Sequence, residues 1–80
     1  MSQIITCTRK IYKNHKLVAV SLRWRVTRTM DDVGGDRIAY FGIRMNRAGT
    51  TFGKDTFICT SRILEQSMES QRWTLTEEVD

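Results

Sequence analysis

The side chains of this chain best suited to recognise another molecule are cationic and aromatic, and they alternate with apolar residues along two segments. Arg23 and Arg25 lie in one segment, and Tyr40 and Arg44 lie in the next. Arginine binds phosphate or carboxylate in a bidentate manner, and a tyrosine ring offers a flat surface on which a base can stack. If both segments are neighbouring strands, these four side chains meet on one solvent-facing surface, together with Lys10 from a strand upstream.

Charge is sorted along the chain, which has 13 Lys and Arg residues against nine Asp and Glu residues. Seven basic residues precede the first acidic residue, Asp31, whereas the last 18 residues contain five acidic residues and only Arg72 as a base. Sorted charge acts on partners at a distance, while scattered charge cancels within a Debye length of about 8 Å. A merely solvated surface mixes both signs, so we expect the basic first half to bind an anionic partner.

The composition predicts a single globular domain, because 80 residues suffice for one small core and 40% of them are apolar. No apolar run is longer than residues 17–20, and Arg9 and Lys10 interrupt any signal-peptide core, so we expect a cytoplasmic protein that does not contact a membrane. Cys7 and Cys59 form no CxxC pair, which predicts buried thiols and neither a metal site nor a cofactor.

The clearest period-two alternation covers residues 17–30 and predicts a long strand. Its dry side consists of Val18, Val20, Leu22, Trp24 and Val26, and its wet side includes Arg23 and Arg25. The DDVGGD segment, residues 31–36, contains two glycines able to form a hairpin turn, and turn chemistry explains its three aspartates better than a cation site. A second alternating strand is therefore predicted over residues 37–47, antiparallel to the first.

In this second strand we expect Ala39, Phe41, Ile43 and Met45 on the dry side and Ile38, Tyr40, Gly42 and Arg44 on the wet side. Residues 4–12 predict a strand upstream, joined to residue 17 by a polar turn that contains Asn14 and His15. Either of its two alternating sets can face the core, and the set of Ile5, Cys7 and Ile11 is preferred.

Residues 48–55 predict a loop, followed by a helix that begins at Asp55 or Thr60 and ends near Gln71. Its apolar stripe of Phe57, Leu64 and Met68 would cover the dry side of the sheet, although residues 57–60 also fit a short strand before a shorter helix. Trp73 and Leu75 indicate a last strand or an extended tail. The expected fold is α+β: a three-stranded antiparallel meander, one covering helix and a C-terminal strand or extended tail.

These observations favour a noncatalytic protein that binds nucleic acid or an acidic protein surface through its basic sheet face. A first alternative is a small inhibitor, of the kind phages encode, that binds a host nucleic-acid-processing or defence enzyme. A second is a metal-independent ribonuclease, for which His15 in a lysine-rich turn is a poor general base. An exposed edge strand on so small a domain also makes a homodimer one assembly open to the chain.

Overall fold

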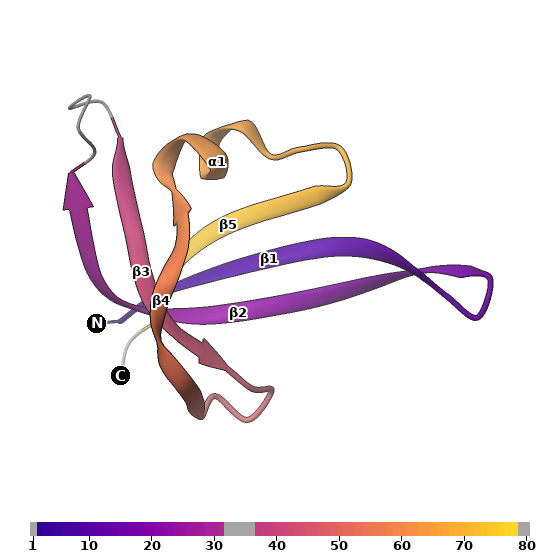
Figure 1. Cartoon of the computed structure of the whole chain (residues 1–80), viewed down its shortest axis with the longest axis horizontal. Coiled ribbons are helices and arrows are strands. Elements are labelled where there is room, and N and C mark those ends of the chain that lie inside the picture. Colours follow the sequence, from indigo (N-terminus) through magenta and orange to yellow (C-terminus); the bar gives the residue numbers. More distant parts are fainter. Residues whose placement is uncertain (1, 32–36, 79–80) are drawn as a thin grey trace.

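The computed structural model describes residues 2–31 and 37–78, which form a five-stranded antiparallel sheet with one short helix (Figure 1). In chain order the elements are β1 (Ser2–Lys13), β2 (Lys16–Asp31), β3 (Ile38–Met45), β4 (Thr51–Thr60), α1 (Ser61–Gln66) and β5 (Gln71–Glu78). The strands lie side by side in the order β4, β3, β2, β1, β5, so β2 is central and β4 and β5 form the edges. Within the described residues no helix is long and apolar enough to span a membrane.

The expected fold class is wrong in the number of strands and in the size of the helix. The three predicted strands are present as β1, β2 and β3, and the last alternating segment is β5, paired with β1. β4 occupies residues 51–60, where a loop and the first helical turns were expected, because its threonines, its two phenylalanines and Ile58 favour an extended backbone. The helix is therefore limited to six residues after Thr60. The predicted turn at residues 32–36 lies outside the described residues.

The register of β2 against β3 overturns the predicted facing of β3. Arg23 lies opposite Met45 and Arg25 lies opposite Ile43, while Trp24 lies opposite Arg44. Directly opposed residues of antiparallel strands point to the same face of the sheet. The predicted dry side of β3 therefore shares a face with the β2 arginines. Residues on both faces of β3 are buried or half-buried, so its apolar pattern contains little information about facing.

A bulge in β2 accompanies this register. The pairing shifts between Val26 and Arg28, which leaves Thr27 as the extra residue, and Thr27 Oγ1 lies 3.3 Å from the carbonyl oxygen of Phe41. Opposite the bulge, a Cβ on Gly42 would lie 2.0 Å from the carbonyl oxygen of Arg25. Only glycine allows the two backbones to approach this closely.

The hydrophobic core lies on the face that α1 covers. Ile5, Tyr40, Ile58 and Cys59 are buried there, and Trp24, Val26, Leu64 and Trp73 pack against them. The rings of Trp24 and Trp73 stack with centroids 5.8 Å apart and an interplanar angle of 17°. Such stacking contributes about 0.5–1.5 kcal/mol beyond the burial of area. Among the predicted helix-stripe residues only Leu64 reaches this core, because Phe57 belongs to β4 and Met68 follows α1, both of them exposed.

The first strand and the cysteines follow the predictions in part. Ile5 and Cys7 are buried as expected, but Ile11 is exposed and Ile4, from the other alternating set, is also buried. Cys7 and Cys59 are free, buried thiols, as predicted. Burial raises the pKa of both thiols, to about 11 for Cys59, and the nearby Arg9 offsets part of this shift at Cys7.

Candidate functional site

The structure does not bring the predicted site residues together on one surface. Tyr40 is buried in the core, so its ring is not available for stacking with a ligand. Arg44 shares the Trp24 face of the sheet, whereas Arg23 and Arg25 point to the opposite face. Lys10 lies apart from them on the exposed part of β1. The expectation of a joint basic face built by Arg23, Arg25, Tyr40 and Arg44 is therefore wrong.

Two strand arginines pair with carboxylates of other strands. Arg23 Nη2 lies 3.1 Å from Glu78 Oε1, and Arg28 Nε lies 3.1 Å from Asp55 Oδ2. The hydrogen bond from Thr27 is the largest cause that lowers the pKa of Asp55, and Arg28 adds to it. These pairs are partly exposed and contribute little to stability. They reduce the positive field of the sheet around Arg23 and Arg28.

An unbroken run of exposed residues that includes three lysines lies on the far half of the β1–β2 hairpin. β5 pairs with β1 only as far as Arg9, and β3 pairs with β2 only from Arg23 onward. Residues 10–19 therefore form a two-stranded ribbon that projects beyond the other strands (Figure 1), and we call these residues the arm. Every residue from 9 to 19 is exposed. At its base the Lys10 backbone N–H donates to the Ser70 carbonyl oxygen at 3.3 Å, so the turn before β5 lies beside that end of the arm.

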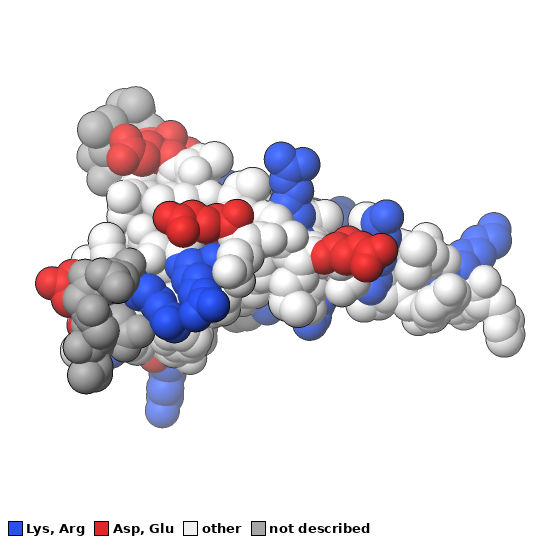
Figure 2. Space-filling model, turned by 90° about the horizontal axis from the view of Figure 1, so that it is seen from above, with Lys and Arg blue, Asp and Glu red and all other residues white. Residues whose placement is uncertain are grey.

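The arm is basic and carries an exposed aromatic ring. It contains Lys10, Lys13 and Lys16 and no acidic residue. Lys13 and Lys16 lie directly opposite each other, an arrangement that is unfavourable between like charges unless an anion lies nearby. Tyr12 is 80% exposed and lies opposite Leu17, on the same face as Lys10. Figure 2 shows basic side chains along the arm out to its tip, whereas the acidic side chains visible there lie over the body and over the turn that leads to β5.

The tip of the arm is a tight turn at the position that the sequence predicts. Asn14 and His15 have φ values of 52° and 63°, which is typical of the two-residue turn that matches the twist of a hairpin. Asparagine tolerates this left-handed conformation better than most residues. The turn therefore fixes Lys13 and Lys16 as neighbours.

The chain matches no family model, no curated protein and no solved structure. Function must therefore be inferred from the residues themselves.

Sequence reasoning missed Lys13 and Lys16 as site residues, although the signal was present. A basic residue on each side of a polar two-residue turn places both cations at the end of a hairpin. The exposure of the arm depends on the lengths of the neighbouring strands. β5 pairs with β1, and β3 pairs with β2, only outside residues 10–19. That depends on the pairing of residues far apart in the chain, which alternation does not reveal.

Proposed function

We propose that this protein binds nucleic acid without catalysing a reaction, and that the arm is the element that contacts the phosphate backbone. The observation that supports this proposal is the structure of the arm. It is an exposed ribbon that contains Lys10, Lys13 and Lys16 and no carboxylate of its own. Lysine binds phosphate as a point charge, and each contact releases a condensed counterion from the nucleic acid. Docking of phosphates also relieves the repulsion between Lys13 and Lys16.

Tyr12 favours nucleic acid over an acidic protein surface. The lysines alone suit either partner, because electrostatic complementarity does not distinguish them. An aromatic ring that is 80% exposed among cations adds a plane on which a base can stack. The ribonuclease alternative is not supported by the predicted residues, since Tyr40 is buried and Arg44 points away from Arg23 and Arg25.

The proposal is tested by fluorescence anisotropy with labelled oligonucleotides of about 20 nucleotides, over a range of salt concentrations. We expect wild-type affinity to fall with salt at a logarithmic slope of about −3 or −4 if four phosphates are contacted. The double variant Lys13→Gln/Lys16→Gln should bind more weakly and reduce the magnitude of the slope by about 2, one for each lost phosphate contact. The matched control is Arg37→Gln/Lys54→Gln, which removes the same charge from exposed positions outside the arm.

Equal losses in both double variants would mean that net charge, rather than the arm, determines binding, and would contradict the proposal. Absence of binding at low salt would also contradict it. Recovery of one defined protein in a pull-down, unaffected by nuclease, would then favour the inhibitor alternative.

A further inference from the structure

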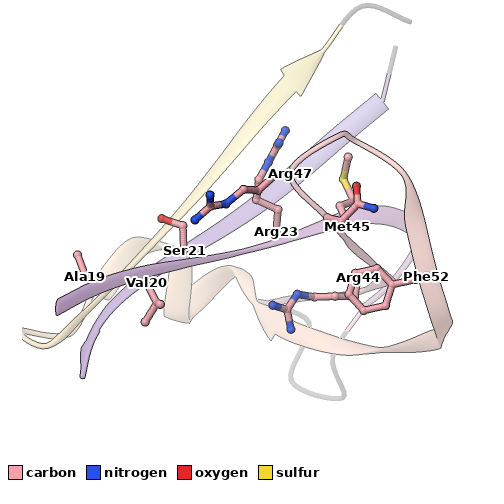
Figure 3. Close-up of a pocket in the computed structure, with 9 residues that line it drawn as sticks. Ala19, Val20, Ser21, Arg23, Arg44, Met45, Arg47 and Phe52 are labelled. Carbon is pink, nitrogen blue, oxygen red and sulfur yellow. The ribbon is translucent and has the colours of Figure 1, made fainter. Parts of the chain in front are cut away.

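A hollow lies at the base of the arm, where β3 ends before β2 does. β3 ends at Met45, opposite Arg23, so residues 16–22 of β2 have no strand partner on this side within the described part of the chain. The hollow beside this free edge has a volume of about 620 Å³ (Figure 3). Its lining includes Val20, Ser21, Arg23, Arg44, Arg47 and Phe52. Three guanidinium groups thus surround one short stretch of strand edge.

Arg44 is held in place by aromatic rings rather than by a carboxylate. Its guanidinium carbon lies 5.5 Å from the ring centroid of Trp24 and 5.9 Å from that of Phe52. Its Nε is buried and finds no hydrogen-bond acceptor among the described residues. A half-buried cation without a compensating carboxylate is costly, and a nearby anion would lower that cost. Cation–π contacts fix the side chain in advance of binding.

The hollow carries a net positive charge. Within the described residues Arg47 has no ion pair, and Arg23 pairs only with Glu78. Arg47 lies in the turn between β3 and β4, which is closed by hydrogen bonds from the Asn46 backbone N–H to the Thr50 carbonyl oxygen at 3.0 Å and from the Thr50 backbone N–H to Asn46 Oδ1 at 3.0 Å. A closed turn limits the entropy lost when Arg47 binds a ligand.

Phe52 adds an exposed aromatic plane beside Arg44. Phe52 is the second residue of β4, and its side chain is 51% exposed. In Figure 3 Arg44 and Phe52, which are paired across β3 and β4, lie on one side of β2, while Arg23 and Arg47 lie on the other. A ligand that crosses the free edge of β2 can therefore reach cations on both sides and the ring on one.

We infer that the hollow binds a single-stranded segment of nucleic acid, with its phosphates near Arg23, Arg47 and Arg44 and one base stacked on Phe52. This inference rests on the proposed function and adds the class of nucleic acid. Phosphates are available in duplexes and single strands alike, but only an unpaired, unstacked base exposes its face to an aromatic side chain. The combination of a cationic groove and an exposed ring is typical of single-strand binding.

The test compares Phe52→Leu with Phe57→Leu, because both rings belong to β4 and both are 51% exposed. Affinity is measured by anisotropy for a single strand of about 20 nucleotides, as DNA and as RNA, and for the corresponding DNA duplex. We expect wild type to prefer the single strand. Phe52→Leu should weaken single-strand binding about 5- to 150-fold, the range of one base stack, with little effect on the duplex. Phe57→Leu should bind as wild type does, and Phe52→Tyr should retain affinity because it keeps a ring.

Failure of this inference is distinguishable from failure of the proposed function. If Phe52→Leu binds the single strand as wild type does while the arm variant loses affinity, the hollow is not a base-stacking site and the arm proposal stands. Equal losses in Phe52→Leu and Phe57→Leu would assign the effect to the stability of β4 and overturn the inference. Absence of binding to any oligonucleotide would overturn both. The ratio of DNA to RNA affinity tells which phosphodiester chain is preferred.

Discussion

Replacement of Gly42 by alanine tests the physical basis of the fold most severely. The added Cβ would lie 2.0 Å from the carbonyl oxygen of Arg25, 2.8 Å from its carbonyl carbon and 3.0 Å from Cδ1 of Ile58. The first two are backbone atoms of the neighbouring strand, which cannot move aside as a flexible side chain can. The β2 and β3 backbones must separate at the bulge, and that separation breaks ladder hydrogen bonds and displaces a core residue.

We expect Gly42→Ala to lower the free energy of unfolding by about 2–4 kcal/mol, from overpacking of about 1–3 kcal/mol and the loss of one or two hydrogen bonds. For a chain of 80 residues the total is about 4–12 kcal/mol, so the loss is a large share of it. Gly49→Ala is the control, because its Cβ meets no atom within 4 Å and only the positive φ of 86° is strained, at about 1 kcal/mol.

The measurement is urea unfolding monitored by tryptophan fluorescence. The dependence of the unfolding free energy on urea concentration is compared between variants, because an equal slope shows that only stability has changed. A loss at Gly42 equal to or smaller than the loss at Gly49 would refute the close approach of β2 and β3.

Four further predictions concern side chains of the sheet. The pKa of Asp55 is lowered in the folded state, so its contribution to stability is present above the unfolded pKa of about 4 and is lost as the pH falls. The urea midpoint of Asp55→Asn should therefore depend less on pH in the acid range than the midpoint of wild type. The pKa of Cys59 is raised to about 11, so stability should fall as the pH rises above the ordinary thiol value toward 11, and less so in Cys59→Ala. Ellman's reagent should label Cys59 only when denaturant opens the core; rapid labelling of the native protein would contradict its burial. Trp73→Leu should lose about 0.5–1.5 kcal/mol beyond the loss of buried area, since it removes the stack on Trp24, and chemical unfolding with a Trp73→Phe comparison would detect it.

The sequence predicts the elements whose two faces differ. β2 alternates apolar and polar residues over much of its length, so its strand character and the opposite pointing of Arg23 and Trp24 are predictable and confirmed. The turn at Asn14 and His15 is predictable because a short polar stretch separates two alternating segments. β5 is predictable from the alternation that includes Trp73 and Leu75. Its pairing with β1, at the opposite end of the chain, is not predictable.

Elements buried on both faces or dependent on distant partners are not predictable in the same way. β3 is apolar on both sides, so alternation placed Tyr40 in solvent when it belongs to the core. Gly42 was the available signal, because an isolated glycine within a strand indicates a bulge or a close backbone approach. β4 has polar residues and Gly53 at its start, a pattern also typical of a loop, and becomes a strand only through pairing with β3. The homodimer and the cytoplasmic location stay predictions.

The central claim is that the arm contacts nucleic acid, and it is tested most directly by titrating ¹⁵N-labelled protein with a single-stranded oligonucleotide while recording backbone amide and arginine Nε–H signals. We predict that the largest shifts fall on residues 10–19 and on the hollow, with a shift of the Arg44 Nε–H signal. Shifts confined to α1 or to the Phe57 end of β4, or no shifts at low salt, would contradict the account.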